Sequence, residues 1–395
     1  MRFSPAKSRR DVRFDSLRGL LLILMAINHV PSDWHGLTDR SLGMFSAAEG
    51  FVFLSGLLAG IVYTKRLRSA GETALRGMAV GRAKRIYTWH LAAFVATLIA
   101  VRLTTFFGDF CSLTSPLLFH YKPFLALLLG STMLYQPGLL DILPMYCGLV
   151  LLIPLVLPAL ERGNRSWVIG LSFLGWLAVQ GAPPVDGAPF YPIVLGAFNW
   201  FAWQFLFVLG LVVGHASAQP SRATAPSPAA TPVRWLLILP ATAFAVYAWG
   251  VHHYQWWQPW SDGVFGIMLN KPALGALRLG DFLIVCYLIA VLGSRFPRLL
   301  NWPPLALLGR NALVVMATQT VAVITMLQFP SFWATASART ISNLVLLAIL
   351  FGSAWVGDRY AARQKAAAAA TAVPSGTLAR RPLPAGRRTY DMPAA

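Results

Sequence analysis

The sequence predicts an all-α polytopic membrane protein with about ten transmembrane helices. Three observations carry this prediction. Hydrophobic residues make up 56% of the 395 residues and charged residues only 12%, about half of the roughly 25% charge found in soluble domains. Apolar runs of about 17–25 residues, each long enough to cross a bilayer, recur along the chain. Lysines and arginines gather in alternate connecting segments, as the positive-inside rule expects.

Ten apolar segments qualify as candidate spans. In chain order they cover residues 16–31, 44–63, 86–105, 139–159, 166–182, 198–216, 235–251, 280–295, 305–327 and 340–357. The first segment is expected to stay in the mature chain, because no small-residue cleavage site follows a short apolar run there. An eleventh apolar run, near residues 123–134, is shorter, and we predict a re-entrant or periplasmic helix for it.

The basic residues decide the orientation of the predicted spans. With ten spans and a cytoplasmic N-terminus, all but six of the 33 lysines and arginines fall on the cytoplasmic side. The six on the outer side are Arg40, Arg102, Lys122, Lys271, Arg278 and Arg339. A spanning helix at 123–134 would place the basic C-terminal segment outside, against the rule. We therefore expect both termini in the cytoplasm.

Composition also divides the chain and excludes several functions. Residues 1–360 are expected to form the membrane domain, with a flexible Pro/Ala/Ser linker at 217–234, and residues 361–395 a disordered basic cytoplasmic tail near anionic lipid. The three cysteines form no metal-ligand pattern, and no metal is expected. No aromatic and basic platform for nucleic acid occurs, so the net charge of +19 is attributed to membrane topology.

The first candidate span carries an arginine and a histidine eleven residues apart. Arg18 and His29 are separated by about 1100° of helical turn, about 20° from eclipsed, and by about 16 Å of rise. Both side chains are costly in hydrocarbon, so each needs a local reason. We predict that His29 acts as a general base near the outer side. The alternatives are a snorkelling arginine and an interfacial histidine.

Two carboxylates are predicted to join His29 in a catalytic site. Glu49 lies near the outer end of the second span, where it can orient the imidazole and stabilise its protonated form. Asp141 begins a later span on the same side, where helix capping is the alternative. Small residues between Gly50 and Gly60 are expected to let helices approach closely.

Two further groups of polar residues mark the ends of the predicted spans. The cytoplasmic group suits phosphate binding, with plain positive-inside residues as the alternative. It comprises Arg18, Arg82, Arg85, Tyr87, His90 and Arg310. The outer group suits sugar binding, with an interfacial aromatic belt as the alternative. It comprises Asn199, Trp200, Trp203 and Gln204.

The separation of these groups suits a long substrate with a phosphate head and a reactive tip. Acyl-coenzyme A fits this description, with its nucleotide held inside and its thioester near His29. The rival class is a transporter or flippase for an anionic solute or a lipid-linked sugar, in which the same residues form a proton-coupled pathway. No internal repeat supports this rival. A sensor or scaffold subunit is a third class.

Several ordered motifs resemble a known family. The pattern of an arginine, ten intervening residues and a histidine in the first helix resembles that of the acyltransferase-3 superfamily. The similarity to the OpgC family within it spans most of residues 10–357. Its motifs are "RDVRFDSLRGLLLILMAINHV", "AAEGFVFLSGLLAGIVY", "RAKRIYTWH", "LDILPMY", "NWFAWQFLFVLG" and "LGRNALVV". The chain departs from the pattern at Asn311, where many relatives are expected to carry histidine.

The resemblance implies a bacterial inner-membrane succinyltransferase that acts on osmoregulated periplasmic glucans or another glycan, with succinyl-CoA as donor. It implies that His29 is the base, Arg18 a coenzyme or tunnel residue, and Glu49 the acidic residue of the site. A succinyl carboxylate would need a cation, for which Lys271 and Arg278 are candidates; solvated loop charges are the alternative reading of both. The expected partners are the lipid bilayer, the glycan and, with the oligomeric state open, a homo-oligomer.

Overall fold

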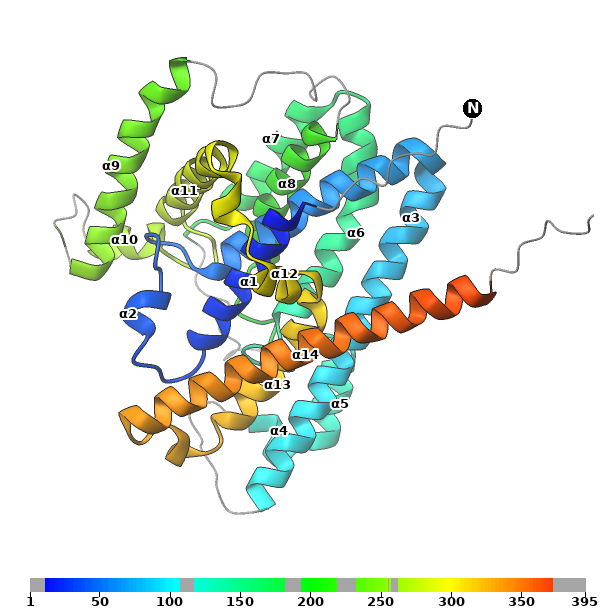
Figure 1. Cartoon of the computed structure of the whole chain (residues 1–395), viewed down its shortest axis with the longest axis vertical. Coiled ribbons are helices and arrows are strands. Elements are labelled where there is room, and N and C mark those ends of the chain that lie inside the picture. Colours follow the sequence, from blue (N-terminus) through cyan, green and yellow to red (C-terminus); the bar gives the residue numbers. More distant parts are fainter. Residues whose placement is uncertain are drawn as a thin grey trace, which may run out of the picture.

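The computed structural model shows an all-helical protein (Figure 1). It describes residues 11–106, 117–181, 193–218, 232–254, 256 and 262–371. Over these ranges the backbone forms no β-strand, only an isolated bridge between Tyr135 and Val194. The predicted all-α class is therefore confirmed. Most of the predicted linker, from 219 to 231, and the chain beyond 371 lie outside the described residues.

Five helices of the described chain are long and apolar enough to cross a membrane. They are α3 (Ala47–Phe106), α6 (Ile142–Glu161), α8 (Trp200–Ser217), α11 (Ala276–Arg295) and α14 (Ala336–Thr371). A sixth span results if α12 (Pro303–Arg310) and α13 (Ala312–Met326), which meet at an 84° bend, are counted together. The number of apolar helices supports insertion into a membrane, but the expected count of about ten spans is not supported.

Helix length explains part of the difference. α1 (Val12–Ile27) has 16 residues and α7 (Arg165–Leu177) has 13, whereas a span needs about 20. The predicted spans 44–63 and 86–105 are two arms of the 60-residue α3, which is interrupted at Gly71 with φ 76°. α9 (Pro232–Tyr254) is also not among the candidate spans.

The remaining elements are short. The run near 123–134 forms α5 (Pro123–Ser131), whose nine residues give a helix of about 14 Å, too short to span. The others are α2 (His35–Thr38), α4 (Leu117–Tyr121), α10 (Asp262–Met268) and the 3₁₀ turns Pro297–Leu300 and Pro330–Trp333. α14 crosses the bundle beside α13 and projects beyond it (Figure 1). Because α14 ends at Thr371, residues 361–371 of the expected tail are helical.

Glycines let α3 and α8 approach closely, as the small residues of the second apolar segment predict. A Cβ at Gly56 would collide with the Phe207 carbonyl, and one at Gly60 with the Leu211 carbonyl. A Cβ at Gly210, the facing glycine of α8, would likewise collide with the Phe53 carbonyl of α3. Backbone contact of this kind is typical of small-residue motifs in membrane helices.

Replacing Gly56 with valine is therefore expected to destabilise the protein. Overpacking a close backbone contact costs about 1–3 kcal/mol, which thermal unfolding in detergent can measure. Gly170→Val is the matched control, because no atom lies within 4 Å of a Cβ at Gly170 in α7. Equal stability of the two variants would contradict the assigned packing.

Candidate active site

A cavity of about 330 Å³ lies where the end of α1 meets the starts of α3 and α6, the middle of α13 and the loop before α11. We call it the histidine cavity. Polar and charged side chains come to it from six separate segments of the chain. They are Asn28, His29, Asp39, Ser46, Asp141, Lys271, Gln319 and Thr320. His29 and Asp141, two of the three predicted catalytic residues, are thus brought together.

The environment of His29 keeps its imidazole ring neutral. Its Nδ1 lies 2.6 Å from the backbone carbonyl oxygen of Met25. A carbonyl can only accept, so Nδ1 donates its proton there and Nε2 keeps its lone pair. His29 lies two residues beyond the end of α1, outside the candidate spans. Burial and the nearby Lys271 ammonium lower the pKa of His29 to about 4, so the ring is neutral at pH 7.

Asp141 is buried at the N-cap position of α6, yet its side chain makes no capping hydrogen bond. Instead its Oδ2 accepts from the Ala197 N–H at 2.9 Å. Gly196, at φ 84°, allows this approach, because a Cβ there would collide with the Asp141 side chain. Burial raises the pKa of Asp141, and the hydrogen bond from Ala197 opposes that rise.

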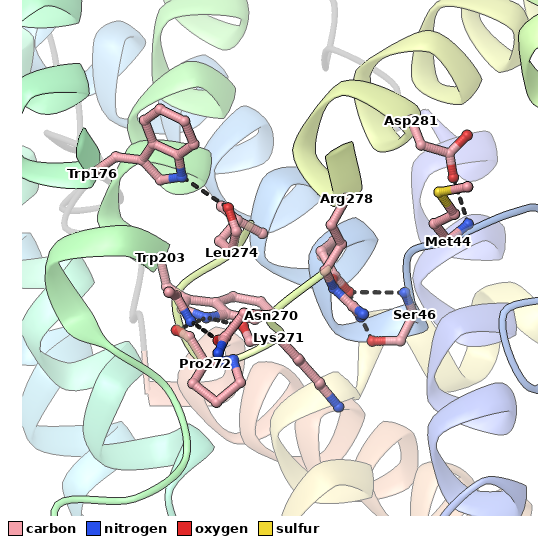
Figure 2. A network of polar contacts seen from close by, with 12 residues as sticks. Met44, Ser46, Trp176, Trp203, Asn270, Lys271, Pro272, Leu274, Arg278 and Asp281 are labelled. Carbon is pink, nitrogen blue, oxygen red and sulfur yellow. Dashed lines mark hydrogen bonds and ion pairs between the residues drawn. The ribbon is translucent and has the colours of Figure 1, made fainter. Parts of the chain in front are cut away.

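Lys271 reaches the cavity from a tightly held loop, residues 270–275, which we call the lysine loop (Figure 2). The Trp203 indole donates to the backbone carbonyls of Lys271 and Pro272 at 3.3 and 3.1 Å. The Trp176 indole donates to the Leu274 carbonyl at 2.9 Å. The Asn270 side chain accepts from the Ala273 N–H at 2.9 Å. These bonds fix the backbone from which the lysine side chain extends.

The Lys271 ammonium is therefore part of the site and not a solvated loop charge. It lies 5.9 Å from the centre of the Phe198 ring, which also lines the cavity. Burial lowers the pKa of Lys271, while the carboxylates of Glu49 and Asp141 oppose this shift. The site thus holds a cation beside a neutral base and a buried carboxyl group.

Glu49 is fully buried but makes its contacts away from His29. Its Oε1 pairs with Nε of Arg278, which is itself only 1% exposed. Its Oε2 accepts from the backbone N–H of Ser46 at 3.0 Å and from the Ser46 hydroxyl at 2.7 Å. Figure 2 shows Arg278 directed toward Ser46. Glu49 therefore holds Ser46 and the start of α3 against α11. The predicted contact between Glu49 and His29 is not seen, because the His29 ring bonds to the Met25 carbonyl instead.

A second, larger cavity of about 700 Å³ lies between α1, α3 and α6. We call it the arginine cavity, because three cations line it: Arg18, Lys65 and Arg82. The Arg18 guanidinium lies 5.6 Å from the centre of the Phe51 ring. The remaining lining is largely apolar, and the volume falls in the roughly 300–1,000 Å³ range of ligand sites.

The two cavities adjoin at one side chain of α13. Met316 lines both of them and is 4% exposed. A methionine side chain is unbranched and has three rotatable bonds, so it adapts readily to its neighbours. The wall between the cationic cavity and the histidine cavity is therefore deformable at this point.

The other predicted phosphate ligands lie elsewhere. Arg85 is exposed and Arg310 lies 3.8 Å from Asp358 on the surface. The Tyr87 hydroxyl donates to the Ser131 carbonyl at 2.8 Å, and His90 Nε2 lies 3.2 Å from the Gly130 carbonyl oxygen. Tyr87 and His90 therefore attach α3 to α5. Of the predicted group, Arg18 and Arg82 line the arginine cavity.

None of the four residues expected to bind sugar lines the histidine cavity. Asn199 caps α8 by accepting from the Phe201 N–H at 3.0 Å. Trp200 packs beside Gly148 of α6. Trp203 holds the lysine loop, and Gln204 exchanges hydrogen bonds with Ser172 of α7. Their contacts support the loop and the helix packing around the site.

Several residues that line the cavities were given no role by the sequence analysis. They are Asp39 and Gln319 in the histidine cavity, and Tyr63 and Lys65 in the arginine cavity. Gln319 has a usable signal, since it is a polar residue deep in an apolar run. Lys65 has the same signal just beyond the predicted span 44–63, but many other basic residues that follow the positive-inside rule share it.

The comparisons with known proteins agree with the motif resemblance. A family model described as OpgC protein matches residues 10–362. No curated protein and no solved structure matches the chain. The family match covers α1 and most of α14, and thus every segment that lines the two cavities. The chain therefore belongs to the OpgC family.

Proposed function

We propose that the protein is a membrane acyltransferase that moves an acyl group from acyl-CoA to a hydroxyl of a glucan. The OpgC family indicates acyl transfer to glucan. The observation that carries the proposal is the contact of two different cavities at Met316. One offers cations to a phosphorylated donor, and the other offers a neutral histidine to an acceptor hydroxyl.

The arginine cavity suits the donor. Arg18, Lys65 and Arg82 are positioned for the phosphates of coenzyme A. The apolar wall that continues to Met316 suits the pantetheine arm, which carries the thioester toward His29. In this proposal the donor is succinyl-CoA, and it enters from the cytoplasmic side of a bacterial inner membrane.

The histidine cavity suits the reaction. His29 Nε2 removes the proton from a sugar hydroxyl, and the oxygen attacks the thioester carbonyl. The Lys271 ammonium stabilises the negative charge that develops on the carbonyl oxygen. The carbon–sulfur bond breaks, the coenzyme thiolate takes the proton from His29, and the ester remains on the sugar. In this mechanism Glu49 positions Ser46 and Arg278, and Asp141 holds the Ala197 backbone at the cavity wall.

The direct test is transfer by the purified protein. The protein in lipid nanodiscs is mixed with succinyl-CoA and with glucan oligosaccharides isolated from a strain in which its gene is deleted. Mass spectrometry is expected to show succinyl esters on the glucan and release of free coenzyme A. Absence of ester with every acyl-CoA tried, together with glucan or anion movement across proteoliposomes, would overturn the proposal in favour of a transporter.

Replacing Lys271 with glutamine is expected to move the acid limb of the pH–rate profile to higher pH. His29 must be neutral to act, and its pKa of about 4 keeps it so well below pH 7. Removing a nearby positive charge favours protonation, so the pKa of His29 rises. The Asp141 pKa rises as well, because Lys271 also lowers that value. Relative kcat/KM between pH 4 and pH 8 measures the shift. An acid limb with an unchanged midpoint, or one at lower pH, would contradict the prediction.

A further inference from the structure

The histidine cavity contains more hydrogen-bond acceptors than its protein neighbours satisfy. The Asn28 Oδ1 and the Gln319 Oε1 are both buried without a hydrogen-bond partner in the part of the chain described. Both residues line the cavity, and Gln319 is 5% exposed. Buried polar atoms normally have a partner, so two orphan acceptors in one cavity point to a ligand that donates.

The orientation of the Asn28 amide is fixed by its other atom. Asn28 Nδ2 donates to the Thr38 carbonyl oxygen at 2.9 Å. A carbonyl cannot donate, so the amide cannot be reversed without losing this bond. The oxygen therefore faces away from Thr38 and remains the acceptor. His29 adds a third acceptor, its Nε2, because Nδ1 donates to Met25.

These acceptors distinguish between the two substrates of the proposed reaction. An acyl chain offers a carbonyl oxygen and, in succinyl, a carboxylate, and neither donates a hydrogen bond. Such oxygens suit the Lys271 ammonium on the loop side of the cavity. A sugar offers several hydroxyl donors. The amide oxygens of Asn28 and Gln319 therefore match the acceptor sugar and not the acyl group that is transferred.

We propose that Gln319, with Asn28, binds hydroxyl groups of the sugar whose neighbouring hydroxyl is deprotonated by His29. This rests on the proposed function and assigns the sugar subsite within it. A cavity of about 330 Å³ lies at the small end of the roughly 300–1,000 Å³ range of ligand sites. It suits one sugar unit of the glucan, with the rest of the oligosaccharide outside.

The test is a steady-state comparison of Gln319→Met and Gln319→Glu with the wild type, using succinyl-CoA and the unmodified glucan oligosaccharides. Methionine keeps the volume and removes the acceptor, whereas glutamate keeps an acceptor oxygen. We expect Gln319→Met to raise the KM for glucan by about tenfold, the loss of one hydrogen bond. The KM for succinyl-CoA is expected to stay unchanged, and Gln319→Glu is expected to raise the glucan KM less than Gln319→Met does.

A matched control is Gln328→Met. Gln328 is a buried glutamine just beyond α13 that donates to the Ile324 carbonyl at 3.0 Å and lines neither cavity. It is expected to leave both KM values unchanged. An unchanged glucan KM in Gln319→Met, or an equal rise in both KM values, would overturn the assignment while leaving the acyltransferase proposal intact.

A binding measurement distinguishes the sugar subsite from the proposed acyl transfer even if no ester is formed. Binding of the glucan oligosaccharides without donor can be followed by isothermal titration calorimetry of the wild type and Gln319→Met. Glucan binding that depends on Gln319 supports the sugar subsite even if the wild type forms no ester. Equal binding by both proteins contradicts the subsite whether or not ester is formed.

Discussion

Replacement of His29 by alanine is expected to abolish acyl transfer to the glucan. General base catalysis contributes about 10²–10⁴-fold to a rate, and among the described residues His29 is the only histidine that lines the histidine cavity. The loss should appear in kcat, because the substrates bind mainly through other residues. Ester formation from succinyl-CoA by purified protein, followed by mass spectrometry, measures the effect.

His35 provides the matched control for this substitution. Its Nε2 lies 3.1 Å from the Ile27 carbonyl oxygen, so it too contacts the backbone of α1. It lines neither cavity. His35→Ala should therefore retain most of the activity, and both variants should unfold within a few degrees of the wild type. Full activity of His29→Ala, or equal loss in both variants, would remove His29 from its catalytic role.

The sequence was sufficient to predict the helical class, and it singles out His29 as the candidate base, which stays a prediction. Hydropathy locates apolar helices because the lipid solvent acts on every residue of a span. His29 stands out because a titratable side chain at the end of an apolar helix needs a local reason. The count of about ten spans is not supported, in part because α1 and α7, which overlap two of the predicted spans, have only 16 and 13 residues.

Long-range pairing explains what the sequence could not show. Glu49 and Arg278 are 229 positions apart, and no local pattern connects them. Lys271 reads as a solvated loop charge until Trp176 and Trp203 are seen to hold its loop. One local signal was available: Ser46 and Glu49 have the spacing of a capping box, in which the glutamate accepts from the N-cap backbone. That pattern predicts the Glu49–Ser46 contact directly.

Removing Glu49 is expected to have the largest effect on stability. The Glu49–Arg278 pair is buried, with exposures of 0% and 1%. In Glu49→Ala the arginine would stay buried without its counter-charge, and the Ser46 N–H and hydroxyl would lose their acceptor. Breaking a buried pair in this way costs about 3–5 kcal/mol. Thermal unfolding in detergent and the yield of monodisperse protein measure the loss.

The matched control is an ion pair of similar geometry at the surface. Arg162 and Glu72 lie 2.6 Å apart with exposures of 64% and 43%. An exposed pair contributes only about 0–1 kcal/mol, so Glu72→Ala should unfold near the wild-type temperature. A larger loss in Glu72→Ala than in Glu49→Ala would show that burial does not set the energy of these pairs.

A double variant separates the charge from the shape of this site. In Glu49→Leu with Arg278→Met both charges are absent, and replacing a buried pair by apolar residues is often neutral or stabilising. The double variant should therefore be more stable than Glu49→Ala. It should nevertheless transfer acyl groups poorly, because Ser46 at the cavity wall has lost the carboxylate that accepts its two hydrogen bonds. Recovery of both stability and activity would show that the ion pair holds α3 against α11 without shaping the histidine cavity.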